Sequence, residues 1–328
     1  MMLKQMDAVL DKILTYNPKI NKNHKFTFID LFAGIGGFHV AAKSLGGKCL
    51  FASEIDKDAR SAYEVNHGLA PHGDITKIDA KEIPDHDILF AGFPCQPFSI
   101  IGDRLGFDDI RGTLFFDISR ILKEKKPPMF MLENVKQLST HSKGKTIKTI
   151  ISDLESIGYK TYFKVLNALN YGLPQKRERT IFVGFMDHSI DFKFPKEIKR
   201  KTLEEILLKD EEIEDKHFAS KRISEKRMTS HKSKYELAIW HENKSGNISS
   251  YPYSCALRAG ASYNYLLVNG KRRLAPRELL RLQGFPDTFK IVCPDTQTRK
   301  QAGNAVPVTM IREVLRSILY AAHLGFKA

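Results

Sequence analysis

The sequence predicts an α/β protein with a mixed, mostly parallel sheet and a smaller second domain. Two observations predict this fold class. Short continuous apolar runs alternate with helical stretches, which is typical of buried parallel strands. The first run, 26–32, leads directly into the glycine-rich turn Ala33-Gly-Ile-Gly-Gly37, as in open α/β sheets that bind ligands at strand ends. A chain of 328 residues can form a large α/β domain and a smaller one.

Composition narrows the class of partner and the cellular setting. With 52 Lys and Arg against 38 Asp and Glu, the formal net charge of +14 suits a polyanion. The four cysteines form no Cys-x-x-Cys pair, so neither a zinc site nor a disulfide framework is indicated, and a reducing cytoplasm fits. The stretch 1–14 has apolar residues at helical spacing but no signal-peptide core. No segment reaches the length of a membrane span, so we expect a cytoplasmic protein without a membrane partner.

The first half of the chain predicts a nucleoside-type cofactor site. Strands are expected at 26–32, 48–54, just before 74 and at 87–92, with a helix from the glycine turn to about Leu45. His39 stands where a dinucleotide fingerprint has its third glycine. Glu54, some twenty residues beyond the turn, can accept hydrogen bonds from a ribose diol, and Asp74 is a second acid at a predicted strand end. Each acid alone equally suits a helix cap. Their order after the glycine turn favours the cofactor site.

Cys95 is the candidate nucleophile. Pro94 follows the buried strand 87–92 and blocks ladder pairing, which places Cys95 just past the strand's carboxyl end. A long glycine-containing loop follows, through Gly112, and loops of this length are usually functional lids. A buried structural thiol is the alternative. The position at a strand end favours a nucleophile over that alternative.

The following segment predicts a helix at 113–122, a strand at 127–133, a helix at 147–157 and strands at 162–169 and 180–184. Glu133 ends the first of these strands. It either faces Cys95 across a cleft or caps the next helix, and the residues alone leave both open. The charged run 171–179 ends on a strand that enters the core, which directs Arg177 and Arg179 toward the same cleft.

Charge patterning predicts the domain organisation. The composition changes at about residue 187, and 216–234 carries seven basic residues against one acidic residue. Residues 251–328 carry a local net charge of +8, with a helix predicted within 272–286 and a terminal helix after 307. We therefore predict a large domain over 1–186, a small domain over 187–271, and a hinge with a return to the large domain over 272–328.

Five short motifs occur in a fixed order, and together they resemble one enzyme family. They are Asp30-Leu-Phe-Ala-Gly-Ile-Gly-Gly37, Gly92-Phe-Pro-Cys-Gln96, Glu133-Asn-Val135, Gln175-Lys-Arg-Glu-Arg179 and Gln301-Ala-Gly-Asn-Ala-Val-Pro307. The set resembles the DNA (cytosine-5-)methyltransferases of compact bacterial restriction–modification systems. The resemblance implies a Rossmann-like S-adenosylmethionine-dependent methyltransferase fold. The residues outside the motifs, roughly 187–271, lie where this family keeps its target-recognition domain.

The resemblance also implies the reaction. The methyl group of S-adenosylmethionine would pass to C5 of cytosine in a specific double-stranded DNA sequence, leaving S-adenosylhomocysteine, without a metal. Cys95 would add to C6 of the base, and Glu133 would hydrogen-bond N3 and the exocyclic amine. Arg179 would contact O2, and Arg177 would help to organise Glu133 and nearby phosphates. The base must leave the helical stack for this chemistry, and the loop after Cys95 would close over it.

Binding residues follow from the same resemblance. The cofactor set would be Phe32, Gly34, Gly36, Glu54, Asp74, Ile75 and Asn304. In the loop after Cys95, Gln96, Ser99 and Arg111 would contact DNA. Arg258 lies among small residues in Cys255-Ala-Leu-Arg-Ala-Gly-Ala-Ser-Tyr263. We interpret Arg258 as a reader of guanine, with a phosphate contact or a solvated position as the alternatives.

Further expectations concern partners and rival functions. Partners would be double-stranded DNA and a cognate restriction endonuclease, with the enzyme acting as a monomer. Two alternatives stay open: a cytosine-5 methyltransferase of transfer RNA, and a non-catalytic DNA-binding relative. An exocyclic-amine methyltransferase is disfavoured because its Asp/Asn/Ser-Pro-Pro-Tyr/Phe motif is missing from the sequence. A nicotinamide dehydrogenase is disfavoured because His39 replaces the third glycine.

Overall fold

The computed structural model describes residues 26–94, 114–261 and 265–322. These residues form two compact units. Unit 1 takes the described residues up to Leu166, together with Arg179–Lys196 and those from Ile311 onward. Unit 2 takes Asn167–Glu178 and Glu197–Met310. Of the segment 272–328, predicted as a hinge and a return to the large domain, residues 272–310 group with unit 2 and the described residues from Ile311 onward group with unit 1. The predicted helix at 1–14, the loop 96–112, Cys95 and Tyr263 lie outside the described residues.

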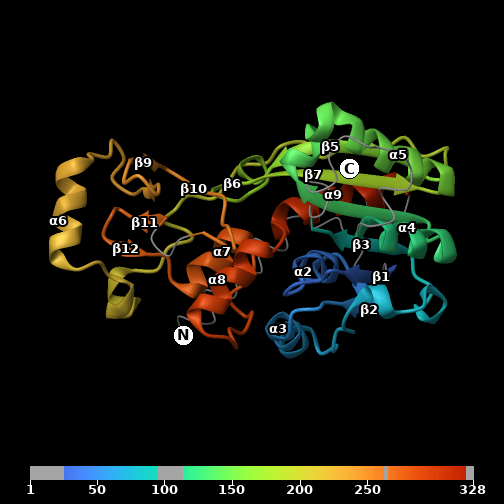
Figure 1. The fold of residues 1–328 in the computed structure, drawn as a ribbon, viewed down its shortest axis with the longest axis horizontal. Helices are drawn as coiled ribbons and strands as arrows, with labels where there is room; N and C mark the ends of the chain where they lie inside the picture. The colour runs from blue at the N-terminus through green and yellow to red at the C-terminus, as the bar shows by residue number, and fades with distance from the viewer. Residues whose placement is uncertain (1–25, 95–113, 262–264, 323–328) are drawn as a thin grey trace. The chain divides into compact units, whose positions relative to one another are not determined.

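Unit 1 is built on a six-stranded sheet with strand order β2-β1-β3-β4-β7-β5 (Figure 1). The strands are β1 Phe26–Leu31, β2 Gly47–Ser53, β3 Ile88–Gly92, β4 Met129–Val135, β5 Lys160–Asn167 and β7 Glu178–Phe185. β1 pairs in parallel with β2 and with β3, and β3 pairs in parallel with β4. β7 runs antiparallel to β4. The predicted mixed, mostly parallel sheet is confirmed.

Helices cover both faces of this sheet. The helices are α2 Gly37–Ser44, α3 Lys57–His67, α4 Leu114–Lys125, α5 Lys145–Ile157 and α9 Val308–Ala321. One continuous cluster of buried side chains joins α4 and α5 to one sheet face, with Phe115 and Ile150 packed among side chains such as Leu89 and Phe130. On the other face, Phe38 of α2 stacks on Phe90 of β3 with ring centroids 5.2 Å apart. The nearly continuous burial of β1 and β3 shows that both sheet faces are covered, as is typical of parallel strands.

Short 3₁₀ turns complete the connections. They are η1 Ile75–Lys77, η2 Ala80–Glu82, η4 Lys136–Ser139, η5 His141–Gly144, η6 Ala168–Asn170, η7 Asp210–Glu212 and η8 Asp215–His217. The strand predicted to end at Asp74 was wrong. Only an isolated bridge forms there, between Ser53 and His72, and Asp74 is the N-cap of η1. The third strand of the sheet along the chain is therefore the later run, β3.

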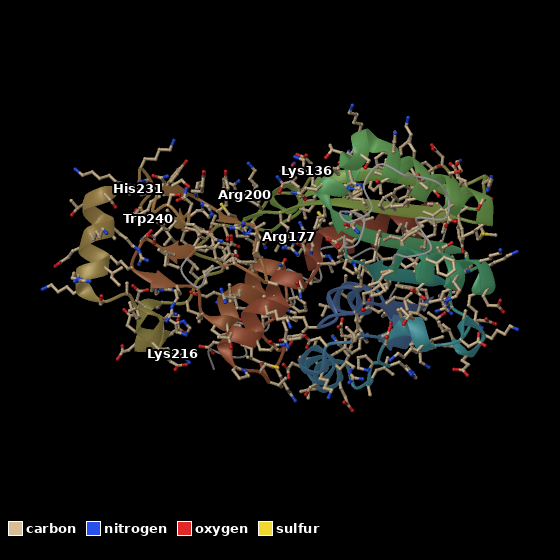
Figure 2. The ribbon with its side chains drawn as sticks, in the orientation of Figure 1. Lys136, Arg177, Arg200, Lys216, His231 and Trp240 are labelled. Carbon is tan, nitrogen blue, oxygen red and sulfur yellow. The ribbon has the colours of Figure 1, made fainter. Side chains whose placement is uncertain are left out.

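Unit 2 contains a four-stranded antiparallel sheet with order β12-β11-β8-β9. The elements are β6 Gln175–Lys176, β8 Ile239–Glu242, β9 Ile248–Tyr251, β10 Ser254–Cys255, β11 Leu266–Val268, β12 Arg272–Arg273, α6 Lys221–Ser230, α7 Pro276–Gln283 and α8 Asp295–Asn304. Trp240, labelled in Figure 2, packs with Ala238 and Leu267 in the core of this unit. Two-residue strands β6 and β10 pair in parallel. Over the described residues no helix is long and apolar enough to cross a membrane.

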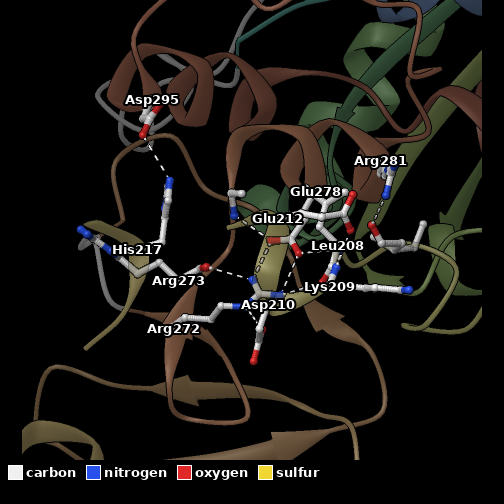
Figure 3. A network of polar contacts seen from close by, with 12 residues as sticks. Leu208, Lys209, Asp210, Glu212, His217, Arg272, Arg273, Glu278, Arg281 and Asp295 are labelled. Atoms are coloured by element: carbon white, nitrogen blue, oxygen red, sulfur yellow. Dashed lines mark hydrogen bonds and ion pairs between the residues drawn. The ribbon is translucent and has the colours of Figure 1, made fainter. Parts of the chain in front are cut away.

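A buried ion pair fixes the start of α7 (Figure 3). Arg272 donates to both carboxylate oxygens of Glu278 at 3.0 Å, and Glu278 has no exposed surface. The same carboxylate accepts the main-chain N–H groups of Ala275 and Leu208. The predicted helix within 272–286 therefore begins only at Pro276, because Arg272 is held in β12. Removing one partner of such a buried pair costs about 3–5 kcal/mol.

Candidate active site

The turn after β1 is shaped by three residues in left-handed backbone conformations. Phe32 has φ 55°, Gly34 has φ 55° and Gly36 has φ 85°. A Cβ built on Gly34 would meet no atom within 4 Å, so the space beside this glycine is open. A Cβ on Gly36 would lie 2.2 Å from His67 Nε2, so the chain there packs tightly against α3. The turn is thus open beside Gly34 and tightly packed at Gly36, as expected of backbone that lies against a ligand.

Glu54 binds the glycine turn directly. Its Oε2 accepts the N–H of Gly34 at 2.7 Å, and its Oε1 accepts the N–H of Asp56 at 2.8 Å. The cap of α3 is Asp56, which accepts from Asp58 and Ala59. The capping alternative for Glu54 is therefore excluded for α3. Each carboxylate oxygen can accept a further hydrogen bond, so Glu54 has capacity to bind a diol from its place at the end of β2.

Asp74 does act as a cap. Its Oδ1 accepts the N–H of Thr76 at 3.1 Å and the hydroxyl of Thr76 at 2.8 Å, and these bonds lower the pKa of Asp74. Its Oδ2 lies 3.9 Å from Lys77 Nζ. Ile75 is buried beside it in the main core cluster. A cofactor contact by Asp74 stays a prediction, and any such contact adds to this capping role.

An exposed apolar side chain next to Glu54 was missed by the sequence analysis. Ile55 is 71% exposed, the most exposed large hydrophobic side chain in the described residues. Phe32 is half-buried and packs against the main core cluster. A lone exposed isoleucine needs no explanation by itself. Its position directly after an acid at a strand end makes it a candidate surface for the apolar face of a nucleoside.

Two buried histidines support the glycine turn from behind. His39 stacks on His67 with ring centroids 4.1 Å apart, and its Nδ1 lies 2.8 Å from the hydroxyl of Tyr63. His67 Nε2 lies 3.1 Å from the main-chain oxygen of Ile35. Burial lowers the pKa of His39 to about 3 and that of His67 to about 4, so both rings are neutral at neutral pH. His39 therefore fills the space that the dinucleotide fingerprint leaves to glycine.

Glu133 and Arg179 form an ion pair at the sheet's carboxyl edge. Arg179 Nε lies 2.6 Å from Glu133 Oε1, and both side chains are largely buried. Glu133 is the register partner of Gly92, the last residue of β3. The 3₁₀ turn after β4 begins at Lys136, and its N-cap position, Val135, has no side-chain cap, so the alternative that Glu133 caps this element is excluded. The arginine therefore holds the Glu133 carboxylate beside the last residue of β3, and Gly92 precedes Cys95 by three residues in the sequence.

Asn134 ties the two strand ends together, a role that the sequence analysis missed. The side chain is buried, and its Nδ2 donates to the main-chain oxygen of Phe93 at 2.9 Å. Its Oδ1 accepts the N–H of Val135 at 2.8 Å. Phe93 lies two residues before Cys95. Asn134 therefore fixes the point where the chain leaves β3, immediately before the candidate nucleophile.

Four predicted residues fall outside the described part of the chain: Cys95, Gln96, Ser99 and Arg111. Their roles stay predictions. The other cysteines can still be compared as rival nucleophiles. Burial raises the pKa of Cys49 to about 12 and raises that of Cys255 as well. Because the thiolate is the nucleophile, these two thiols are poorly suited to the reaction at neutral pH.

Arg177 is a buried clamp within unit 2. Its guanidinium donates to the main-chain oxygens of Leu257, Gly303 and Ala305 at 2.8, 3.0 and 2.8 Å (Arg177 is labelled in Figure 2). Asn304, the predicted cofactor residue, lies exposed at the last position of α8 between two of these carbonyls. Arg177 thereby fixes the backbone on both sides of Asn304. Its predicted role toward Glu133 and phosphates stays a prediction.

Comparison with known proteins gives the family. The family model for C-5 cytosine-specific DNA methylases matches residues 26–320. The chain is 54% identical over 303 residues to the Type II methyltransferase M.HaeII of Haemophilus aegyptius, covering 92% of this chain and 95% of that protein. It is 41% identical over 319 residues to M.HhaI of Haemophilus parahaemolyticus, covering 92% and 95%.

Solved structures agree in fold. The structure of S. pombe Dnmt2 methyltransferase aligns with a TM-score of 0.69 at 20% identity, over 90% of this chain and 98% of that one. A putative DNA modification methyltransferase from an E. coli prophage aligns with a TM-score of 0.69 at 22% identity, over 91% and 99%. The predicted methyltransferase fold is confirmed. From the match over nearly the whole described sequence, this chain belongs to the C-5 cytosine-specific DNA methylase family.

Proposed function

We propose that this cytosine-5 DNA methyltransferase takes its methyl group from S-adenosylmethionine and modifies one cytosine within a specific double-stranded DNA sequence. The observation that carries the proposal is the arrangement at the carboxyl ends of β1 to β4. The glycine turn with Glu54 lies at one end of this row, and the Glu133–Arg179 pair lies at the other. Ligands of open α/β sheets bind along this edge.

The residues of the turn fit the cofactor. The open side of Gly34 admits close backbone approach, Glu54 can accept the ribose hydroxyls, and Ile55 can cover one face of the adenine. Asp74, Ile75, Phe32, Gly36 and Asn304 complete the proposed set. When bound, the cofactor supplies an electrophilic methyl group at its sulfonium. The protein residues have to orient that methyl group and exclude water.

The proposed chemistry at the base begins with Cys95. Its thiolate adds to C6 of the flipped cytosine, forming the S–C6 bond and moving electron density to C5, which accepts the methyl group. Glu133 stabilises the electron-rich ring through N3 and the exocyclic amine, and Arg179 holds both Glu133 and O2. Loss of the C5 proton and expulsion of the thiolate restore the aromatic base. Cys95, Glu133 and Arg179 therefore act as nucleophile, ring stabiliser and positioning cation.

Partners extend the proposal. Several relatives are named Type II methyltransferases, and we propose a companion restriction endonuclease for the same sequence. The net charge of +14 supports binding to the phosphate backbone.

Bisulfite sequencing tests the function directly. We expect plasmid DNA from a host without its own cytosine-5 methyltransferase to retain unconverted cytosine at one position of one short sequence after expression of this protein. Nucleoside mass spectrometry should identify 5-methylcytosine rather than N4-methylcytosine, and a Cys95→Ala variant should leave all cytosines convertible. Complete conversion with folded wild-type protein, or methylation found only in transfer RNA from the same cells, would contradict the proposal.

A further inference from the structure

The main chain around Arg258 is held at almost every residue. Leu257 donates its N–H to Gln175 Oε1 at 3.0 Å, and its carbonyl oxygen accepts from Arg177 at 2.8 Å. Gln175 and Arg177 are both buried. The backbone of Arg258 and Ala259 lies so close to Gly303 that a Cβ there would stand 2.4 Å from the Ala259 nitrogen. A segment fixed in this way has lost the mobility of an ordinary surface loop.

Tyr265 fixes Arg258 itself through two contacts. Its hydroxyl accepts the main-chain N–H of Arg258 at 2.8 Å. The Arg258 guanidinium lies over the Tyr265 ring, with its carbon 5.1 Å from the ring centroid. Tyr265 is buried, and the ring of His241 packs edge-on against it. Both the backbone and the side chain of Arg258 therefore rest on one rigid aromatic residue.

The guanidinium of Arg258 is available to a ligand. The side chain is exposed, and within the described ranges of the chain no carboxylate forms an ion pair with it. By contrast, Arg227 and Arg272 in the same unit are both paired with acidic side chains. A phosphate contact needs only a mobile positive charge. Reading the edge of a guanine needs two N–H donors held in one orientation, so that both bond to O6 and N7. A guanidinium that packs on an aromatic ring provides that fixed orientation.

We propose that Tyr265 is a positioning residue that holds Arg258 in the orientation from which it reads one guanine of the recognition sequence. The inference rests on the proposed DNA methylation and extends it to the source of sequence specificity. Fixing a long side chain before binding removes part of its rotamer-entropy cost. The orientation of the fork, rather than the charge of Arg258, then sets discrimination at that base pair.

The test measures kcat/KM on the cognate duplex and on duplexes that each carry one replaced base pair. Arg258→Ala should lose roughly ten- to a hundredfold on the cognate duplex. On the duplex that already lacks the critical guanine, the variant should keep nearly the wild-type kcat/KM. The ratio of kcat/KM between cognate and replaced duplex therefore falls at that position alone. Arg258→Lys should behave similarly, because it keeps the charge and loses the fork. Arg222→Ala on the exposed face of α6 is the matched control and should leave discrimination unchanged at every position.

Tyr265 variants test the positioning role. Tyr265→Leu removes the ring and should reduce discrimination at the same guanine, with no further effect when combined with Arg258→Ala. Tyr265→Phe keeps the ring and removes the hydroxyl, which accepts the Arg258 N–H at 2.8 Å and donates to the main-chain oxygen of Ala256 at 3.4 Å. We expect it to reduce that discrimination a few-fold, and it serves as the test if the leucine variant melts below the assay temperature.

Several results would overturn the inference. One is a uniform loss on all duplexes with a flatter salt dependence, which marks a phosphate contact. Others are wild-type discrimination in Arg258→Lys, or Tyr265 variants that change thermal stability and leave discrimination unchanged. Failure of the proposed function is distinguishable, because it would appear as wild-type protein that methylates no DNA cytosine at all.

Discussion

Replacing Glu133 by glutamine is expected to lower kcat by roughly a hundredfold or more. The carboxylate lies at the end of β4, held 2.6 Å from Arg179 Nε. Glutamine has nearly the same shape but carries no charge, so it lacks the carboxylate that, in the proposed mechanism, stabilises the ring through N3 and the exocyclic amine. The proposed cofactor site lies around Glu54, so the dissociation constant for S-adenosylmethionine should stay near the wild-type value. Single-turnover methylation of a cognate duplex, with calorimetry of cofactor binding, measures both quantities.

The control for this change is Glu124→Gln. Glu124 is an exposed carboxylate in α4 of the same unit. The chemical change is therefore identical, and the Glu133–Arg179 pair stays intact. It should leave kcat unchanged. The Glu133 variant also weakens a largely buried ion pair, so its melting temperature is measured alongside. If Glu133→Gln lowers stability and keeps the wild-type kcat, the Glu133–Arg179 pair is structural and the proposed role in catalysis is wrong.

Replacing Glu54 by alanine is expected to weaken S-adenosylmethionine binding about tenfold or more. Each hydrogen bond lost from a buried partner costs about 1–3 kcal/mol, and 1.4 kcal/mol corresponds to a factor of about ten in affinity. The same change also releases the N–H of Gly34 from its bond to Oε2. The turn that we propose to bind the cofactor then loses this hydrogen bond. Titration calorimetry of the free protein with S-adenosylmethionine gives the dissociation constant directly.

Asp56→Ala separates cofactor binding from helix capping. Asp56 caps α3, and replacing it by alanine leaves the Glu54–Gly34 hydrogen bond in place. Loss of the cap should lower the free energy of unfolding by about 1 kcal/mol. The cofactor dissociation constant of this control should not change. The assignment of Glu54 would be contradicted if Glu54→Ala behaved like the control, with lower stability and unchanged cofactor affinity.

The sheet and its glycine-rich turn could be predicted from the sequence because their signals are local. Buried parallel strands read as apolar runs, and the run before Cys95 was placed within one residue of β3. The glycine turn was identifiable because φ values of 55° and 85° at Gly34 and Gly36 favour glycine. The strand predicted before Asp74 was wrong because an acid after a glycine marks a 3₁₀ cap equally well.

The supporting contacts could not be predicted because they join residues far apart in the sequence. Asn134 binds the carbonyl of Phe93, His67 lies against Ile35, and Glu278 binds Leu208. Nothing in the local pattern around these residues distinguishes a buried clamp from a solvated side chain. Arg177 shows the same limit. The sequence motif places Arg177 only in a charged run. The fold shows that its guanidinium is buried and donates hydrogen bonds to three main-chain carbonyl oxygens.

The central claim is that Cys95 attacks the target base, and a duplex with 5-fluorocytosine at the methylated position tests it most directly. The reaction normally ends with loss of a proton from C5, and fluorine cannot leave as a cation. After methyl transfer the S–C6 bond should therefore persist, and S-adenosylhomocysteine should be released. Peptide mass spectrometry should place the modified nucleotide on Cys95, with no adduct in Cys95→Ala. An adduct on Cys49, Cys255 or Cys293, or full turnover by Cys95→Ala on ordinary DNA, would contradict the mechanism.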